Sequence, residues 1–166
     1  PYQQELTILQ TAPGISSPFT AIGIISEIGT NMEAFPSAKH LCSWAGLTPT
    51  NNESAGKKKS VRVSKAGCYI KPLLVQCANA VVKSTKHPEM RNRYLRLKKR
   101  RGHKKAIIAI ARMLLTALYH MLKNGENYNA ELYQKSDLLP VDREITVEQA
   151  LMIARNQGYK IKSATA

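Results

Sequence analysis

Cysteine is scarce in this sequence of 166 residues, which contains Cys42, Cys68 and Cys77. The number is odd and no two of them have CxxC spacing, which argues against a disulfide framework and against a zinc ribbon. The four histidines lie far apart and have no carboxylates at ligand spacing. We therefore predict no metal site in this chain and a reducing, cytosolic setting.

The sequence also lacks an uninterrupted apolar run that could cross a membrane. Its longest apolar stretches, residues 72–82 and 106–122, are broken by polar or charged side chains, whereas a span needs roughly 20 apolar residues. No signal-peptide pattern opens the sequence, and neither terminus has the basic amphipathic pattern of a surface anchor. We therefore predict no membrane partner.

Acidic residues are nearly absent from the middle of the chain. Residues 57–112 hold eighteen of the 25 Lys and Arg residues and one acidic residue, Glu89, a local charge of +17 against +14 for the whole chain. Charge segregated in this way repels itself unless something anionic faces it, and a nucleic-acid backbone is the commonest dense polyanion. The basic segment therefore predicts a nucleic-acid partner.

What is present is typical of one medium-sized domain, with a hydrophobic fraction of 43% that is sufficient for a core. Proline and glycine divide the first fifty residues into short helices. A helix should end near residues 13–14, and a second should run from residues 17–18 to Gly29, forming a helix-hairpin-helix. The second helix would carry Ile22, Ile25 and Ile28. A third, over residues 37–45, would bring Leu41 and Trp44 to the core.

Residues 47–67 lack apolar periodicity until Val61 and Val63, so we predict a long loop that contains a short β-hairpin. Helical spacing then predicts helices over residues 68–83, 89–101 and about 107–122, the last of them central to packing. Residues 1–128 form the expected domain. Residues 129–166 should be a connector and a docked helix that starts near Thr146. The expected fold class is mainly α.

The turn over residues 11–17 is the first candidate site. A helix-hairpin-helix turn exposes backbone N–H groups and a helix N-terminus, which can hold a phosphate without reading sequence. Gly14, Ser16 and Ser17 would line this phosphate site. An ordinary helix–helix turn explains the same residues, because Pro-Gly marks turns of many kinds.

The loop over residues 51–60 is the second candidate. Ser54 lies close to a glycine and a run of lysines, so its hydroxyl could attack a phosphodiester whose flanking phosphates are held by cations. No base for the serine is identifiable, a solvated loop is the alternative, and Ser60 and Ser64 are rival nucleophiles. The cations that would neutralise phosphates here are Lys57, Lys58, Lys59, Arg62 and Lys65.

The expected helix over residues 89–101 is the third candidate. Like charges four residues apart, such as Arg96 and Arg100, repel each other, so a phosphate backbone explains this helix better than a solvated face. Tyr94 and Tyr69 are candidates for nucleotide contact, although core packing explains a tyrosine in an apolar stripe equally well. The phosphate-binding residues expected here are Arg91, Arg93, Arg96, Lys98, Lys99, Arg100, Arg101, Lys104 and Lys105.

Five blocks of the sequence, in order, resemble the C-terminal transposase domain of the IS110 (IS116/IS110/IS902-type) family of insertion-sequence transposases. Because all five match across about residues 6–128, the resemblance is more specific than any single motif. The blocks are LQTAPG at residues 9–14, FPSAKHLCSWAGLTP at 35–49, ESAGK at 53–57, VSKAGCYIKPLLVQCA at 63–78 and HKKAIIAIARMLLTALY at 103–119.

The resemblance implies a bacterial or archaeal, nucleoid-associated DNA recombinase in two parts. An N-terminal RuvC-like domain would bind a divalent metal, expected to be Mg²⁺, and the C-terminal domain would supply a serine that forms a covalent phosphoserine with DNA. The family's serine falls on Ser54. A guide RNA is a further implied partner, and recombination of two duplexes implies a dimer or tetramer of the complete protein.

Two residues depart from the family's pattern, and one domain is missing. Ala55 and Ser16 stand where glycine is common in the family, which should stiffen both loops without removing a functional group. Because no RuvC-like domain is included in this sequence, we expect a fragment that cannot cleave DNA alone and that holds no cofactor. The alternatives are a non-catalytic helix-hairpin-helix binding module and a structural RNA-binding protein.

Overall fold

The computed structural model describes residues 2–49, 52–54, 57–60, 62–132 and 151–152. The chain divides into two compact units, Pro1–Glu131 and Leu132–Ala166. Almost all of the second unit lies outside the described residues. Most of the expected connector, and most of the helix expected from Thr146, therefore also lie outside them. The helices and strands between residues 3 and 124 belong to the first unit.

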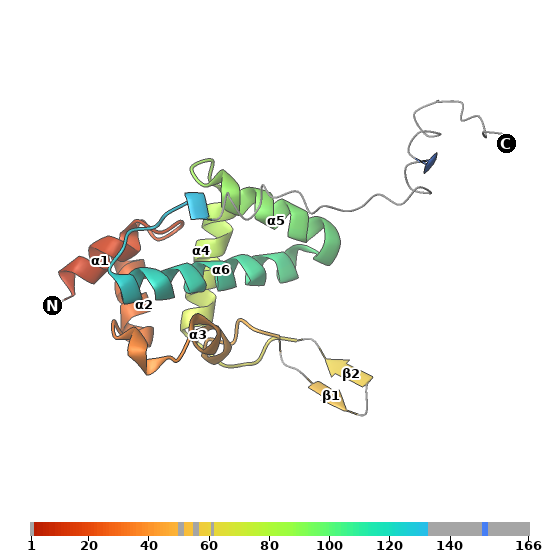
Figure 1. Ribbon diagram of the computed structural model, residues 1–166, viewed down its shortest axis with the longest axis horizontal. Coiled ribbons are helices and arrows are strands. Elements are labelled where there is room, and N and C mark those ends of the chain that lie inside the picture. Colours follow the sequence, from red (N-terminus) through yellow and green to blue (C-terminus); the bar gives the residue numbers. More distant parts are fainter. Residues whose placement is uncertain (1, 50–51, 55–56, 61, 133–150, 153–166) are drawn as a thin grey trace, which may run out of the picture. The chain divides into compact units, whose positions relative to one another are not determined.

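The first unit is mainly α-helical, which confirms the expected fold class (Figure 1). One 3-10 turn, η1, covers Met32–Ala34, and one antiparallel hairpin joins β1 (Asn52–Ser54) to β2 (Lys57–Ser60). The helices in the described residues are α1 (Gln3–Gln10), α2 (Pro18–Ile28), α3 (Ala38–Trp44), α4 (Ile70–Lys83), α5 (Pro88–Arg101) and α6 (His103–Asn124).

Helix α6 is the centre of the domain, as its apolar periodicity predicts. It packs against α1, α3, α4 and α5 (Figure 1), because its apolar residues recur every three to four positions and form a broad stripe. Gly125, with φ +68°, ends the helix. Ten of its residues are buried: Ala106, Ile107, Ile110, Ala111, Leu114, Leu115, Ala117, Leu118, Tyr119 and Met121.

By length and composition alone, α6 also qualifies as a membrane span. Its most apolar window has a mean hydropathy of 1.4, and 56% of that window is buried within the domain. The core helix of a globular domain passes the same test, so this property is weak evidence for a membrane location. The burial of α6 against four other helices accounts for its apolar composition.

The opening pair of helices is arranged around a turn that rests on α4. Gly14 has φ +77°, and a Cβ at this position would lie 2.6 Å from the carbonyl oxygen of Cys77 in α4. Glycine is therefore required both by the backbone conformation and by the close approach. The predicted helix, turn and helix are present, with Pro18 at the start of α2.

Two packing predictions for the first fifty residues are wrong. The buried residues of α2 are Ala21, Ile24 and Ile28, whereas Ile22 is 49% exposed. Trp44, expected in the core with Leu41, is 44% exposed and lies with its ring 5.7 Å from that of Phe35 at the surface. Leu41 is fully buried, as expected.

The long loop contains the expected hairpin and is tied to the domain at its base. Pro49 and Val63 form an isolated antiparallel bridge below the strands. On the return side, Lys71 Nζ of α4 donates a hydrogen bond of 2.5 Å to the carbonyl oxygen of Ser64. The hairpin is therefore held through its base, and Figure 1 shows the strands extending beyond α3.

Candidate nucleic-acid interface

The longest run of exposed cations follows α5 and turns into α6. Gly102, with φ +80°, is both the C-cap of α5 and the N-cap of α6, so the chain changes direction at one residue. We call the exposed Lys and Arg residues on the two sides of this reversal the basic corner. They are Arg91, Arg93, Arg96, Lys98, Lys99, Arg100, Arg101, Lys104 and Lys105, and each is exposed.

A narrow set of contacts holds α5 against the domain. Met90 is fully buried and Tyr94 is 8% exposed. The Tyr94 hydroxyl lies 2.9 Å from Nδ1 of His103, which links α5 to the first residue of α6. Lys98 Nζ lies 5.8 Å from the centre of the Tyr94 ring, within cation–π range. Since few side chains anchor α5, the rest of its surface is available for charge.

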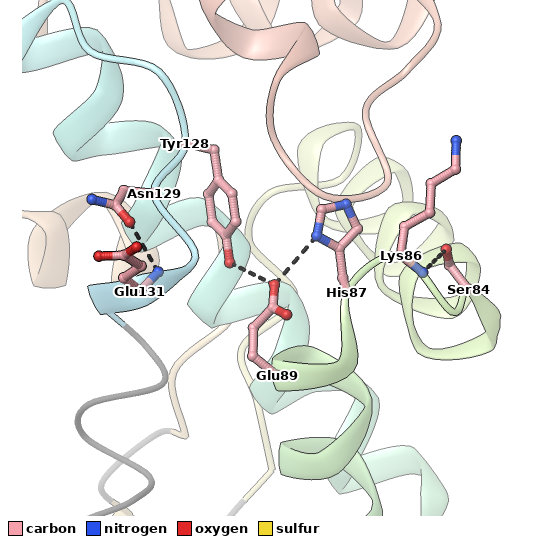
Figure 2. A network of polar contacts seen from close by, with 7 residues as sticks. All are labelled: Ser84, Lys86, His87, Glu89, Tyr128, Asn129 and Glu131. Carbon is pink, nitrogen blue, oxygen red and sulfur yellow. Dashed lines mark hydrogen bonds and ion pairs between the residues drawn. The ribbon is translucent and has the colours of Figure 1, made fainter.

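The one acidic residue of the basic segment is turned inward. The Glu89 side chain is 3% exposed, and its Oε1 lies 3.2 Å from His87 Nδ1. The Tyr128 hydroxyl donates a 3.2 Å hydrogen bond to the same oxygen (Figure 2). Tyr128 is itself held by its backbone N–H, which donates to Thr11 Oγ1 at 2.9 Å. The Glu89 carboxylate is therefore hydrogen-bonded inside the domain and is not exposed among the cations.

The hairpin places Ser54 in a defined backbone register. Ser54 pairs with Lys57 and Glu53 pairs with Lys58 across the antiparallel ladder, and Asn52 pairs with Ser60 after a register shift. The pairing brings the backbone of Ser54 next to the lysine run. The side chains of residues 52–60 lie outside the described part of the structure, so the nucleophilic role of Ser54 stays a prediction.

The remaining predicted residues of this loop are two exposed cations and one half-buried serine. Arg62 and Lys65 are exposed at the return end of the loop, as a phosphate-binding role requires. The rival Ser64 is half-buried, and its Oγ accepts a 3.3 Å hydrogen bond from the Ala66 N–H. That bond gives the Ser64 hydroxyl a local structural role.

The turn over residues 11–17 has a packing role that is independent of any ligand. Gly14 faces the backbone of α4 at Cys77. Ser16 is exposed and Ser17 is half-buried at the N-cap of α2, where its side chain makes no capping hydrogen bond. Phosphate binding by Gly14, Ser16 and Ser17 stays a prediction.

The cysteines show no sign of a reactive or metal-binding site. Burial raises the pKa of Cys77 to about 11 and also raises the pKa of Cys42, whose Sγ lies 3.5 Å from Thr116 Oγ1. Both thiols therefore stay neutral near pH 7. Cys68 is exposed. Within the described ranges, no three His, Cys, Asp or Glu side chains come together as metal ligands.

Sequence reasoning missed two features of this surface. The pairing of Glu89 with Tyr128 joins residues 39 positions apart, and no sequence motif signals it. The two candidate tyrosines also differ: Tyr94 is buried, whereas Tyr69 is 72% exposed. A helical stripe containing Met90, Tyr94 and Leu97 does favour burial of Tyr94, but nothing local specifies the exposure of Tyr69.

Comparison with known proteins identifies the family. Residues 6–95, more than half of the chain, match the transposase family described as IS116/IS110/IS902. This chain belongs to the IS116/IS110/IS902 transposase family. The matched region includes the opening turn, the serine hairpin, α4 and the first half of α5, and the resemblance seen in the sequence is therefore confirmed.

Curated relatives of this transposase family member cover most of the chain. An uncharacterized 43.6 kDa protein of insertion element IS110 from Streptomyces coelicolor is 28% identical over 127 residues, which are 75% of this chain and 30% of the relative. Pilin gene-inverting proteins of Moraxella bovis and Moraxella lacunata are each 28% identical over 132 residues, 77% of this chain and 40% of the relative. The chain thus spans less than half of their length. No solved structure matches it.

Proposed function

We propose that this chain is the DNA-binding and serine-supplying part of a transposase that also contains a metal-binding domain. Family membership supports the recombination activity. The observation that carries the binding role is the basic corner, where nine exposed cations lie on α5 and the start of α6 and the acidic residue of the same segment, Glu89, is buried. A surface of this kind attracts the phosphate backbone of nucleic acid.

In the proposed reaction, Ser54 Oγ attacks the phosphorus of a DNA phosphodiester. The serine loses its proton, a phosphoserine ester forms, and the bond from phosphorus to one deoxyribose oxygen breaks, so that this oxygen leaves as a hydroxyl. A deoxyribose hydroxyl of another DNA end then displaces the serine and restores the phosphodiester. Lys57, Lys58, Lys59, Arg62 and Lys65 would balance the phosphate charge around Ser54.

The divalent metal implied by the family does not fit the described residues of this chain. They contain no cluster of three His, Cys, Asp or Glu side chains. We propose instead that another domain of the complete protein holds Mg²⁺, and that the isolated chain binds DNA without cutting it. A guide RNA as second nucleic-acid partner, a cytoplasmic location without a membrane partner, and a dimeric or tetrameric complete protein belong to the same proposal.

Strand exchange by the complete protein tests the role of Ser54. Ser54→Ala should abolish strand exchange and the covalent protein–DNA adduct, while the affinity for DNA stays within about twofold, because a hydroxyl contributes little beside many phosphate contacts. Ser60→Ala and Ser64→Ala serve as matched controls and should retain exchange. Full activity of all three variants would favour the non-catalytic binding module, whereas loss of exchange in Ser60→Ala or Ser64→Ala alone would assign the nucleophile to that serine.

A further inference from the structure

Tyr69 is an exposed aromatic residue that the fold does not explain. The hydroxyls of Tyr94, Tyr119 and Tyr128 each bond within the domain, to His103, to the Phe35 carbonyl oxygen and to Glu89. The Tyr69 ring is 72% exposed, and within the described residues its hydroxyl has no protein partner. An exposed ring at the start of α4 is therefore free to contact a ligand.

A groove between α2 and α4 lies beside this ring. Tyr69, Pro72 and Leu73 form its α4 side, and Gly23 forms part of its α2 side. The groove is open to solvent and has a volume of about 380 Å³. The missing side chain at Gly23 keeps the groove open, because a Cβ there would lie 3.2 Å from Leu73 Cδ2. We call this feature the Tyr69 groove.

The polar residues of the Tyr69 groove favour the base of a nucleotide over its phosphate. Glu27 lines the groove from α2, and its carboxylate repels phosphate but can accept hydrogen bonds from the amino groups of bases. Gln76 lines it from α4, so its amide can donate to and accept from a base edge. A mainly apolar lining with a few polar groups suits a planar heterocycle.

Two exposed cations precede the groove residues of α4 in the sequence. The loop that leads into Tyr69 carries Arg62 and Lys65, both exposed. Lys71, two residues after Tyr69, holds this loop through its 2.5 Å bond to the Ser64 carbonyl oxygen. The segment that leads to Tyr69 is therefore cationic, whereas the acidic residue Glu27 lines the groove itself.

We propose that the Tyr69 groove binds an unpaired base of a single nucleic-acid strand, DNA or RNA, with Tyr69 as the stacking platform. A base in a duplex has both faces covered by its neighbours, whereas an unpaired base gains stacking energy on an aromatic side chain. This site deepens the proposed function, on which it rests, by adding single-strand recognition to backbone binding.

The test measures the affinity of the 166-residue chain for three probes at one salt concentration. The probes are oligodeoxycytidylate and oligocytidylate, whose bases carry an amino group, and a DNA duplex with the same number of phosphates. Tyr69→Ala should weaken binding to at least one single strand by about 5- to 150-fold, the usual effect of removing one stacking platform. Duplex affinity should change by less than about twofold. The two single strands report whether the base is taken from DNA or from RNA.

Three further variants make the result specific. Tyr69→Phe should retain single-strand affinity, because the ring supplies the stacking surface. Tyr2→Ala, the same change at a tyrosine that is 53% exposed and does not line the groove, should have no effect. Gly23→Leu fills the groove and should reproduce the single-strand defect of Tyr69→Ala, while urea unfolding checks that each variant remains folded.

Two kinds of result would overturn the proposal, and only one of them would also overturn the proposed nucleic-acid function. If Tyr69→Ala binds every probe as tightly as the unsubstituted chain, the groove does not hold a base. If Tyr69→Ala instead changes the sedimentation coefficient, the groove is a protein interface and does not hold a base. If the unsubstituted chain binds neither single strands nor duplex, the proposed nucleic-acid function fails together with this site.

Discussion

Helices α5 and α6 are consecutive, packed on each other and opposite in character. In α6, ten of 22 residues are buried, and in α5 three of 14 are buried: Glu89, Met90 and Tyr94. A single residue, Gly102, separates them. The comparison shows how a small domain carries a strongly charged helix, because α6 supplies the core and α5 needs only a narrow stripe and contacts near its two ends.

The division has a functional consequence. Since the position of α5 depends on few side chains, all the others can be cationic without removing packing energy. The cost is mutual repulsion among like charges on one helix, which a polyanion would relieve on binding. Stability and nucleic-acid binding should therefore respond to different residues, and substitutions in the two helices test this separation, from the largest expected effect to the smallest.

A cavity in α6 should have the largest effect, and it should act on stability. Leu114 is fully buried, so Leu114→Ala should lower the free energy of unfolding by about 3–5 kcal/mol, as for other buried Leu→Ala changes. Urea unfolding measures this loss. Leu95→Ala on α5, where the side chain is 48% exposed, is the control and should cost less than about 1 kcal/mol. Equal losses would mean that α5 contributes to the core as α6 does.

Neutralising α5 should act on binding and leave stability nearly unchanged. Replacing Arg91, Lys98, Lys99 and Arg100 together by Gln should reduce the slope of log affinity against log salt by about 3.6, if each contacts one phosphate of duplex DNA. At low salt the affinity should fall on the order of 100- to 1,000-fold. Lys39→Gln, an exposed cation on α3, is the control and should leave the slope unchanged.

Loss of the buried charge network should have a smaller effect, on stability alone. Glu89→Gln weakens the contacts with His87 and Tyr128, and we expect a loss of about 1–3 kcal/mol because buried partners are left poorly satisfied. Glu126→Gln, at an exposed position, should be neutral. A change in DNA affinity without a change in stability would show that Glu89 acts on the ligand instead.

The smallest expected effect is at the link between the two helices. Tyr94→Phe keeps the packed ring but removes the 2.9 Å hydrogen bond to His103, which should cost about 0.5–1.5 kcal/mol of unfolding free energy. Tyr69→Phe removes a hydroxyl that has no partner in the described part of the chain and should be neutral in the same unfolding measurement. A neutral Tyr94→Phe would show that the Tyr94 hydroxyl does not stabilise the contact of α5 with α6.

The fold was predictable where a single periodicity was available. Helix α6 has one broad apolar stripe and polar residues opposite, so both its position and its buried face follow from the sequence. Helix α2 is different, since apolar residues occupy most of its length and several faces fit the core equally well. The sequence therefore predicted α2 as a helix but selected Ile22 where the structure buries Ile24.

The candidate site was predictable in composition and less so in geometry. Exposure of the expected α5 cations follows from their charge, because a charged side chain is costly to bury without a partner. The apolar stripe of α5 favours burial of Tyr94, but the sequence around Tyr69 does not specify whether that tyrosine is buried or exposed. Packing of α5 on α6 buries Tyr94 and leaves Tyr69 as the exposed candidate.

The sequence by itself determined the segregation of charge, the helix boundaries marked by Pro18, Gly102 and Gly125, and the family, because these depend on residue order alone. Only the tertiary structure decided that Glu89 accepts a hydrogen bond from Tyr128, that Gly14 packs against the backbone of Cys77, and that a groove lies open beside Tyr69. Each of these joins residues distant in sequence, and their partners are set by how the helices pack, which local propensity does not specify.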